Sequence, residues 1–216
     1  MSRVRVKICG VTRVEDALLA CELGADAIGI VMTPSSPRCV TIARARTIRD
    51  ALPAFVDAVV LAHDLAADMV RAAIDGVRPD YVQFHGLESA ALCESFGVRY
   101  VKALGMAGEL DVRAIAAEHA NAAGFVLDGH PPGQQGGQGR AFDWSRVPQD
   151  LGRPIILAGG LHAGNVGDAI QAVHPWAVDL ASGVESAPGI KDGAKMRAFF
   201  AAVRSANPGS SANECK

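Results

Sequence analysis

Short apolar runs rich in valine and isoleucine recur along the chain, and an amphipathic segment follows most of them. Eight runs have the length and β-branched content of buried strands; they span residues 4–8, 26–31, 56–61, 80–84, 98–103, 124–128, 154–158 and 176–180. Seven segments between or after them place apolar residues at helical spacing; they span residues 14–23, 42–52, 66–75, 88–96, 111–119, 163–173 and 191–204. After the sixth run, only a short turn following Asp143 is expected. The pattern therefore predicts eight β–α units.

The spacing of these units indicates how they assemble. The expected strand ends, from residue 9 to residue 181, fall roughly 18 to 30 residues apart, and alternating strands and helices favour parallel pairing with right-handed crossovers. Eight such units close into a (β/α)8 TIM barrel. A doubly wound sheet is the alternative, but no GxGxxG follows the first strand. We predict one α/β barrel domain over residues 1–204 and a short, flexible, disordered tail over residues 205–216.

Composition and charge narrow the function classes. Of the 216 residues, 50% are hydrophobic, and 21 Lys and Arg against 23 Asp and Glu give a net charge of −2, which does not favour nucleic-acid binding. The five cysteines show no CxxC spacing, which is typical of reduced thiols rather than of a disulfide framework or a zinc site. No signal peptide or membrane-spanning run is evident, so we expect a cytoplasmic protein without membrane contact.

Candidate chemistry begins with residues 124–144. The apolar run ends at the carboxylate of Asp128, and a glycine-rich loop that includes Gly136 and Gly137 follows. A buried strand needs no charge at its end, so Asp128 is either a loop cap or an acid in a site. Clustered glycines bring backbone N–H groups close to an anion, which suits a phosphate or a lid. Both functional interpretations put chemistry at the carboxyl end of this strand.

Polar residues and glycines also concentrate where the other strands end, at the face that carries the active site in such barrels. These positions are Cys9-Gly10, residues 33–38, His85-Gly86, Asp128, Gly159-Gly160 and Ser182-Gly183. Alternation along the first strand points Lys7 and Cys9 into the barrel, and alternation along the fourth does the same for Gln83 and His85. Asp179 of the eighth strand should point the same way and neutralise Lys7.

Cys9 and Asp128 come from strands that lie well apart in an eight-stranded ring, so they should face each other across a ligand. A thiolate and a carboxylic acid so arranged can act as general base and general acid. The structural alternatives are a small buried thiol and a loop cap. Because a free thiol is only slightly ionised at neutral pH, Cys9 would need a positive group or a hydrogen-bond donor nearby.

A phosphate site is predicted from glycines in three loops. Gly159-Gly160 and Ser182-Gly183 follow the seventh and eighth strands, whose loops often hold a phosphate in these barrels, and Gly136-Gly137 follow the sixth; left-handed turns are the alternative. Arg38 is either a solvated loop residue or a residue whose planar guanidinium binds a substrate carboxylate through two hydrogen bonds. Five further histidines share no metal spacing, so no metal site is expected, and we interpret them as surface or capping residues: His63, His119, His130, His162 and His174.

Eight motifs, in order along nearly the whole chain, resemble the phosphoribosylanthranilate isomerase family, (β/α)8 enzymes of tryptophan biosynthesis. They are KICG at 7–10, GADAIG at 24–29, PSSPR at 34–38, QFHG at 83–86, LD at 127–128, GGQGRAFDW at 136–144, LAGGL at 157–161 and SGVESAPGIKD at 182–192. Departures from the family pattern include Phe84, Gln138 and Ala181. Gln138 and Ala181 border loops in which backbone N–H groups would bind phosphate, so function should survive these changes.

The resemblance implies roles for individual residues. Cys9 would be the general base, Asp128 the general acid, and Arg38 the partner of the anthranilate carboxylate, while His85 matches a family histidine and is counted as substrate-binding. The substrate would be a phosphorylated sugar, N-(5-phosphoribosyl)anthranilate, and the reaction an Amadori rearrangement. Asp128 would protonate the furanose oxygen and open the ring to a Schiff base; Cys9 would then remove the C2′ proton. The substrate nitrogen is the electron sink, so no cofactor or metal is implied.

Two other functions stay open at this point. A related phosphosugar barrel, such as the aldose–ketose isomerase of histidine biosynthesis, would use a pair of aspartates, whereas the first strand here ends in Cys9. A phosphate-ligand-binding barrel without catalysis is the second alternative. The exterior helices show no distinct apolar stripe, so either a monomer or a homodimer is expected.

Overall fold

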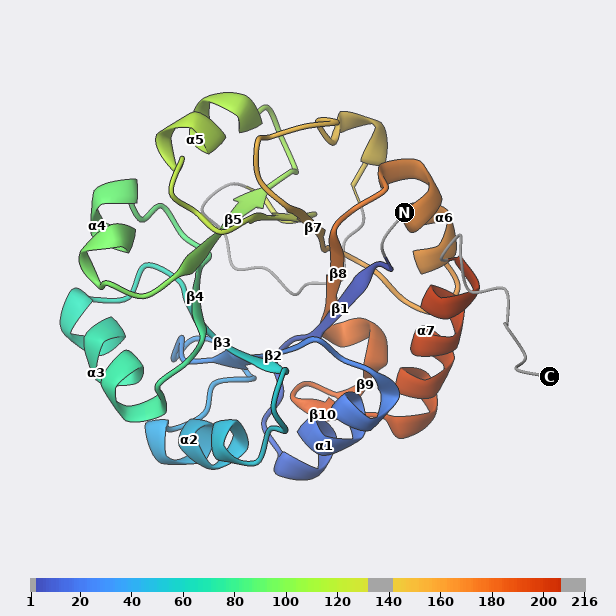
Figure 1. The fold of residues 1–216 in the computed structure, drawn as a ribbon, viewed down its shortest axis with the longest axis horizontal. Coiled ribbons are helices and arrows are strands. Elements are labelled where there is room, and N and C mark those ends of the chain that lie inside the picture. Colours follow the sequence, from blue (N-terminus) through green and yellow to red (C-terminus); the bar gives the residue numbers. More distant parts are fainter. Residues whose placement is uncertain (1–2, 132–141, 207–216) are drawn as a thin grey trace.

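The computed structural model describes residues 3–131 and 142–206. Eight parallel strands form a closed barrel in sequence order, each paired with its neighbours and β8 paired with β1 (Figure 1). The strands are β1 (Arg5–Ile8), β2 (Ala27–Val31), β3 (Asp57–Ala62), β4 (Tyr81–Phe84), β5 (Tyr100–Gly105), β6 (Phe125–Asp128), β7 (Ile155–Leu157) and β8 (Ala177–Leu180). The predicted fold class is therefore confirmed.

Helices surround the barrel and cover the outer faces of its strands (Figure 1). They are α1 (Val14–Leu23), α2 (Ile42–Asp50), α3 (Ala67–Val77), α4 (Ala90–Ser95), α5 (Val112–Glu118), α6 (Val166–Val173) and α7 (Gly193–Ala206). Four of them begin at side-chain caps: the side chains of Thr41, Ser89, Asp111 and Asp192 each accept a hydrogen bond from a backbone N–H in the first turn. Such caps satisfy donors that a helix start leaves unpaired, which explains why these helices begin where they do.

Three short elements complete the described chain. A 3-10 turn, η1 (Trp144–Arg146), stands where a short turn was expected after Asp143, and a second one, η2 (Ser182–Val184), follows β8. After η2, the antiparallel pair β9 (Glu185–Ala187) and β10 (Ile190–Lys191) forms a hairpin that the sequence pattern did not predict. This hairpin stands before α7 and contributes two charged residues to the site described below.

The boundary of the predicted tail needs a correction. The helix α7 continues through Ser205 to Ala206, two residues beyond the expected domain end at residue 204. The hydroxyl of Ser205 donates to the carbonyl of Ala201, so this polar residue is accommodated within the last helical turn. Residues 207–216, the remainder of the predicted tail, lie outside the described residues.

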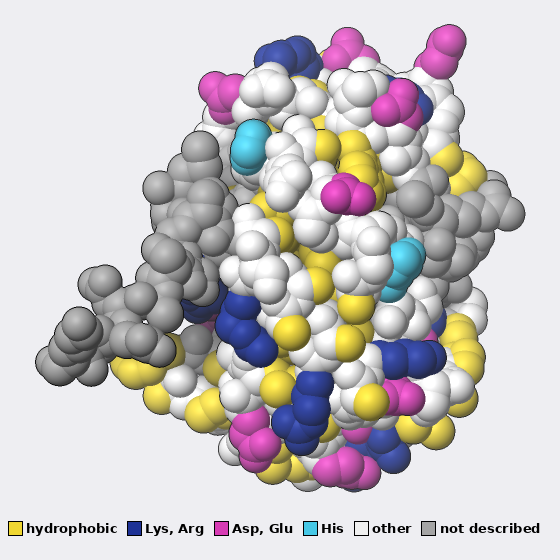
Figure 2. Space-filling model, turned by 90° about the vertical axis from the view of Figure 1, so that its right-hand side faces the viewer, with side chains coloured by type: hydrophobic (Ala, Val, Ile, Leu, Met, Phe, Trp, Pro, Cys, Tyr) yellow, Lys and Arg dark blue, Asp and Glu magenta, His cyan; other side chains and the backbone are white. Residues whose placement is uncertain are grey.

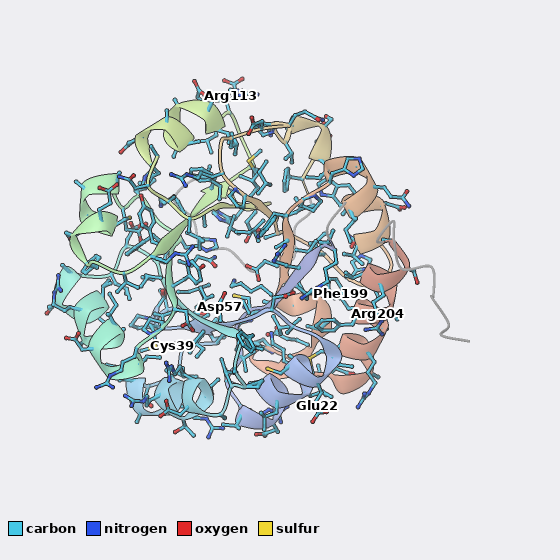
Figure 3. The ribbon with its side chains drawn as sticks, viewed as in Figure 1. Glu22, Cys39, Asp57, Arg113, Phe199 and Arg204 are labelled. Atoms are coloured by element: carbon cyan, nitrogen blue, oxygen red, sulfur yellow. The ribbon has the colours of Figure 1, made fainter. Side chains whose placement is uncertain are left out.

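The apolar core lies mainly between the strands and the helices. Ile8, Ile28, Phe84, Phe125 and Phe199 are among the large side chains that are completely or almost completely buried, and Phe199 extends from α7 toward the barrel (Figure 3). Alternation along the strands directs the four strand residues outward to the helices, while the inward positions hold both polar side chains, such as Lys7 and Gln83, and small apolar clusters such as Val59 with Leu61.

One buried ion pair lies inside the barrel where the ring closes. Lys7 of β1 and Asp179 of β8 are register partners, and Nζ of Lys7 lies 2.6 Å from Oδ2 of Asp179. The contact expected from the sequence is present. It neutralises a charge beneath the pocket at the seam between the first and last strands.

The molecular surface shows no single-sign charge field on the side drawn in Figure 2, where Lys and Arg side chains and Asp and Glu side chains lie interspersed. Among the described residues, no helix combines the length and apolar character that crossing a membrane requires.

Candidate active site

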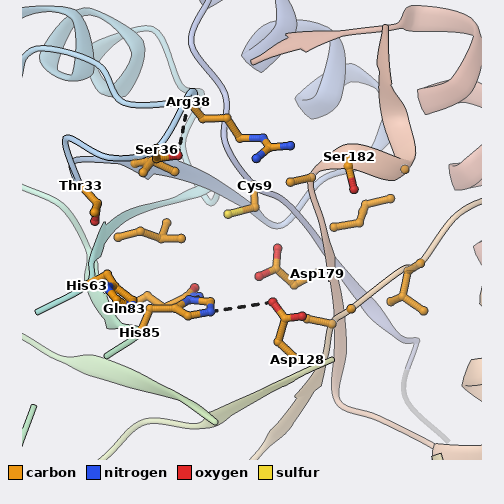
Figure 4. Close-up of a pocket in the computed structure, with 18 of the residues that line it drawn as sticks. Cys9, Thr33, Ser36, Arg38, His63, Gln83, His85, Asp128, Asp179 and Ser182 are labelled. Carbon is orange, nitrogen blue, oxygen red and sulfur yellow. Dashed lines mark hydrogen bonds and ion pairs between the residues drawn. The ribbon is translucent and has the colours of Figure 1, made fainter. Parts of the chain in front are cut away.

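A pocket opens at the carboxyl ends of the barrel strands. Its empty volume, open mouth included, is about 720 Å³, which lies within the range of small-molecule sites, roughly 300–1,000 Å³. Side chains reach it from β1, β4, β6 and β8 and from the loops after β2 and β7 (Figure 4). Glycines from the last two β–α loops form part of its wall.

The structure brings most of the predicted site residues to this pocket. The residues that line it are Cys9, Arg38, His85, Asp128, Gly159, Gly160, Ser182 and Gly183. Gly136 and Gly137 lie outside the described residues. Cys9 and Asp128, which are 9% and 8% exposed, enter the pocket from β1 and β6 (Figure 4). They therefore face one ligand-sized space, and their chemical roles stay predictions.

Opposing effects act on the thiol of Cys9. Burial raises its pKa, the ammonium groups of Lys7 and Lys191 lower it, and the carboxylate of Asp179 raises it again. The net result is a pKa above the ordinary value, which favours the thiol form in the free protein. The positive groups that the sequence alone could not identify are thus Lys7, from the same strand, and Lys191, from the unexpected hairpin.

Lys191 connects the hairpin to the first strand. Its Nζ donates to the carbonyl oxygen of Cys9 at 2.5 Å and to that of Ala181 at 3.2 Å, and it lies 2.9 Å from Oε1 of Glu185. Burial lowers the pKa of Lys191, and the charge of Glu185 partly restores it. A buried lysine with these three acceptors fixes the backbone beside the thiol.

Arg38 is paired with a carboxylate from the hairpin of β9 and β10. Its Nε and Nη2 donate to the two carboxylate oxygens of Glu185 at 2.8 and 2.7 Å, a bidentate pair. The pairing raises the pKa of Arg38, since the hydrogen bond with Glu185 outweighs burial. The aliphatic part of the Arg38 side chain also packs over Gly10, where an added Cβ would meet Cδ of Arg38. The guanidinium is therefore held at the pocket by Glu185.

His85 belongs to a chain of buried polar contacts. Its Nδ1 lies 3.1 Å from Nε2 of Gln83, its Nε2 lies 2.8 Å from Nε2 of His130, and the same Nε2 lies 3.8 Å from Oδ2 of Asp128. Burial lowers the pKa of His85 well below its ordinary value, protonation of His130 would lower it further, and the ammonium groups of Lys7 and Lys102 act in the same direction. His85 is therefore a neutral imidazole at physiological pH.

Two histidines differ from their interpretation as surface or capping residues. His130 and His119 are each only 2% exposed. Nδ1 of His119 lies 3.3 Å from the hydroxyl of Tyr100, within the layer between barrel and helices. His130 stands two residues after Asp128, and the alternation of a strand continued by two residues would have turned both toward the pocket. His130 contacts His85 without lining the pocket, and continued alternation after Asp128 is the only sequence signal for that position.

The two predicted phosphate loops touch each other. Gly159 and Gly160 have φ angles of 88° and 65°, which glycine adopts without strain, and the side-chain amide of Asn165 donates to the carbonyl of Gly160 at 2.9 Å. Gly183 approaches the next loop so closely that an added Cβ would collide with the carbonyl oxygen of Leu161. A left-handed turn is thus present at Gly159-Gly160, in a loop that lines the pocket, whereas Gly183 lies in the 3-10 turn η2 without a positive φ.

The fold and the pocket together define the class of protein, a (β/α)8 barrel with the pocket at the face where enzymes of this fold have their active sites. A thiol, a carboxyl group and glycine-containing loops surround this pocket. The family model described as N-(5′-phosphoribosyl)anthranilate isomerase matches residues 6–202. This chain belongs to that family.

Individual relatives agree with the assignment. The N-(5′-phosphoribosyl)anthranilate isomerase of Xanthomonas oryzae pv. oryzae is 49% identical over 211 residues, covering 95% of each chain. The crystal structure of the Thermus thermophilus phosphoribosyl anthranilate isomerase is similar at a TM-score of 0.85 and 39% identity, over 94% of this chain and 100% of that one. A phosphoribosyl anthranilate isomerase crystallised with reduced 1-(o-carboxyphenylamino)-1-deoxyribulose 5-phosphate is similar at a TM-score of 0.82 and 35% identity, over 94% of this chain and 99% of that one.

These similarities confirm the prediction at the level of activity class: the chain is an isomerase of tryptophan biosynthesis. The ligand in the related complex is a phosphorylated sugar derivative, and a dimeric family member has also been obtained as monomers. The roles of single side chains in this chain need a separate argument.

Proposed function

We propose that this chain converts N-(5-phosphoribosyl)anthranilate to 1-(2-carboxyphenylamino)-1-deoxyribulose 5-phosphate by acid–base catalysis between Cys9 and Asp128. The observation that carries the proposal is that these two side chains, from β1 and β6, line the same pocket from different sides (Figure 4). In this mechanism, Asp128 donates a proton to the furanose ring oxygen. The C1′–O bond then breaks, and the anthranilate nitrogen takes up the positive charge as a Schiff base.

The second step moves a proton from carbon to sulfur. The thiolate of Cys9 removes the C2′ proton, the C–H electron pair forms the C1′–C2′ double bond of an enolamine, and the iminium nitrogen becomes neutral. Protonation at C1′ and loss of the proton of the C2′ hydroxyl then give the ketose. Lys7 and Lys191 supply the positive charges that a transient thiolate beside them requires. Positioned proton transfer of this kind contributes roughly 10²- to 10⁴-fold per group.

Two further groups orient the substrate in this proposal. Arg38 holds the anthranilate carboxylate at the pocket mouth, and its bidentate contact with Glu185 keeps the guanidinium in place beforehand. The backbone N–H groups near Gly159-Gly160 and Ser182-Gly183 bind the 5′-phosphate. His85 contacts the substrate from β4, the side of the pocket nearest Asp128.

The environment of the enzyme is also part of the proposal. The reduced thiols Cys9, Cys21, Cys39 and Cys93, none of which forms a disulfide, are compatible with the cytoplasm. A small phosphorylated substrate, with no nucleic acid as partner, agrees with the near-zero net charge. The enzyme works as a monomer or a homodimer.

The test compares two variants with matched controls. Cys9→Ala and Asp128→Asn should each reduce turnover of freshly prepared phosphoribosylanthranilate, followed by loss of its fluorescence, by at least about 10²-fold while keeping affinity for the reduced product analogue. Cys21→Ala on α1 and Asp75→Asn on α3 remove the same groups away from the pocket and should leave turnover unchanged. Near-normal turnover in either pocket variant would exclude that residue from the mechanism.

A further inference from the structure

Three side chains that could bind a metal ion meet at one edge of the pocket, which His85 and Asp128 line and behind which His130 lies in contact with His85. The candidate ligand atoms of His85, Asp128 and His130 lie within 4.8 Å of one another, and all three residues are buried. Nε2 of His85 lies 2.8 Å from Nε2 of His130 and 3.8 Å from Oδ2 of Asp128. Two imidazoles and one carboxylate are the protein ligands of many zinc sites that keep an open position.

The hydrogen bonds of His130 direct a lone pair toward this meeting point. Nδ1 of His130 lies 2.7 Å from the carbonyl oxygen of Pro131, and a carbonyl can only accept, so Nδ1 carries the proton. In the neutral imidazole, Nε2 is then bare and faces His85. A metal-binding histidine typically donates its other ring N–H to an oxygen in this way, which fixes the ring orientation.

Gln83 can prepare His85 in the same manner. Its Nε2 lies 3.1 Å from Nδ1 of His85, whereas its Oε1 is buried without a hydrogen-bond partner among the described residues. A half-turn of the amide brings Oε1 to that position. In the metal-free protein the proton between the two Nε2 atoms belongs to His85, because His130 carries its own on Nδ1. With the amide turned and a metal ion bound, His85 would instead carry its proton on Nδ1, donate it to Gln83 and present a bare Nε2. The rotation satisfies a buried oxygen that otherwise lacks a donor.

The observed distances require little adjustment to hold a zinc ion. A Zn–N bond of about 2.0 Å and tetrahedral angles place neighbouring ligand atoms about 3.3 Å apart. The 2.8 Å separation of the two nitrogens must widen, and the 3.8 Å separation of nitrogen and oxygen must shorten, each by about 0.5 Å. The separation of the His130 and Asp128 ligand atoms, which is at most 4.8 Å, must also approach about 3.3 Å, and rotations of the three side chains would have to supply these changes.

The positive charges nearby do not prevent a cation from binding. Lys7 and Lys102 are the ammonium groups whose charge reaches His85, and each has a carboxylate of its own: Asp179 at 2.6 Å and Glu88 at 3.0 Å. Their fields are therefore largely cancelled at close range.

We propose that His85, Asp128 and His130 form a binding site for Zn²⁺ or a similar late divalent metal ion, and that the bound ion inhibits the isomerase by sequestering Asp128. The fourth coordination position would face the open pocket. Nitrogen ligands select such ions over Mg²⁺, which prefers oxygen. The binding rests on geometry alone, and the inhibition rests on the proposed function of Asp128.

Binding is tested directly by calorimetric titration of the chelator-treated protein with ZnCl₂ and, separately, MgCl₂. The wild type should bind one Zn²⁺ at this site and no Mg²⁺. His130→Gln should weaken zinc binding at least about 100-fold, and Gln83→Leu, which removes only the outer contact, about 10- to 100-fold. The exposed His174→Gln is the matched control and should bind as the wild type does. Equal affinity in the wild type and both pocket variants would overturn the proposal.

The cysteines also attract zinc, so the ligand set needs its own measurement. Co²⁺ in place of Zn²⁺ should give visible bands of a four- or five-coordinate site without the thiolate charge-transfer absorption of a cysteine ligand. Thermal unfolding of the metal-free variants shows whether His130→Gln and Gln83→Leu are folded. A thiolate band that disappears in Cys9→Ala would overturn the assignment of these three ligands.

Inhibition is measured separately, relative to the metal-free rate of each protein. Zn²⁺ should suppress turnover of the wild type reversibly, with EDTA restoring it, and His130→Gln should need at least about 100-fold more Zn²⁺. Zinc bound at the site without inhibition would overturn the second half of the proposal. A metal-free wild type without isomerase activity would instead contradict the proposed function and leave the binding result intact.

Discussion

The Cys9 thiol lies close to two buried ammonium groups, yet its pKa is raised because removal from water outweighs them. The pKa of a buried thiol between opposing effects changes strongly when any one neighbouring charge is removed. Lys7 has two partners, since both Asp179 and Cys9 raise its pKa against the effect of burial. The charge state of the catalytic candidate is thus set by three residues around the barrel seam.

This balance predicts the alkylation behaviour of Cys9. Because only the thiolate reacts, the rate of iodoacetamide modification of the Cys9 peptide, measured by mass spectrometry, should be low at pH 7 and rise about tenfold per pH unit into the alkaline range. Lys7→Met removes a positive charge and leaves Asp179 unpaired, and both changes should move the profile to higher pH. A rate that is independent of pH between 7 and 9, or a profile shifted to lower pH by Lys7→Met, would contradict the assignment.

Arg38 gives a prediction about binding. Arg38→Ala should raise KM for phosphoribosylanthranilate by roughly 10- to 100-fold with a smaller effect on kcat, since a charged hydrogen bond contributes about 1.5–3 kcal/mol. Arg113 on the outer side of α5 is the matched control (Figure 3). Thermal unfolding separates this effect from any instability caused by leaving Glu185 with only Lys191 and the backbone N–H of Gly189 as partners among the described residues. An unchanged KM would remove Arg38 from carboxylate binding.

At the scale of elements, the contact between the seventh and eighth β–α loops is the feature most sensitive to substitution. Gly183→Ala should raise KM about tenfold or more and lower the melting temperature, because the new methyl group meets the carbonyl of Leu161 and overpacking costs about 1–3 kcal/mol. Gly167→Ala within α6, where an added Cβ has ample room, is the control and should leave KM unchanged. A normal KM in Gly183→Ala would indicate that phosphate does not bind at this contact.

The elements themselves were predictable because local pattern and tertiary structure agree. Each barrel strand is buried on its outer face and carries β-branched residues, so composition and length identify it. Some element boundaries differ from the prediction because a turn determines them. Gly97, whose φ is 69°, lies in a turn before β5, and β5 starts at Tyr100 rather than at residue 98. The hairpin of β9 and β10 has only three and two residues, too few for periodicity to register.

The predictable part of the site was the part that lies at strand ends. Alternation and position placed Cys9, His85 and Asp128, and the Lys7–Asp179 contact followed from the same reasoning. The pairing of Arg38 with Glu185 joins residues 147 positions apart through a hairpin that was not foreseen. The contact between His85 and His130 depends on how the chain turns after β6. Contacts of this kind are fixed by tertiary geometry, which a single sequence does not encode in any local pattern.

The whole molecule should lose stability in mild acid. The pKa values of His85 and His119 are lowered in the folded state by burial, whereas both groups titrate near 6.5 when unfolded. The stability that these neutral histidines contribute is therefore fully present above about pH 6.5. It is lost as the pH falls below that value, because the unfolded state then binds more protons than the folded state.

This linkage is measurable by urea unfolding in EDTA-containing buffer. The free energy of unfolding should decrease between pH 7.5 and 5.5, and the decrease should be smaller in His85→Gln and in His119→Gln than in the wild type. His174→Gln, at an exposed position, should keep the slope of the wild type. A wild-type stability that does not change over this range would show that these histidines are not held neutral by the fold.

The three contacts of Lys191 have a consequence for protein engineering. Lys191 donates a hydrogen bond to the backbone of Cys9, and Glu185 of the same hairpin pairs with Arg38. The loops after β1, β2 and β8 are therefore connected to one another through this hairpin. A designer who transplants the cysteine alone into another barrel would transfer the proposed base without the residues that position it. The cysteine and the hairpin of β9 and β10 should therefore be transferred together, as the smallest unit that keeps these contacts.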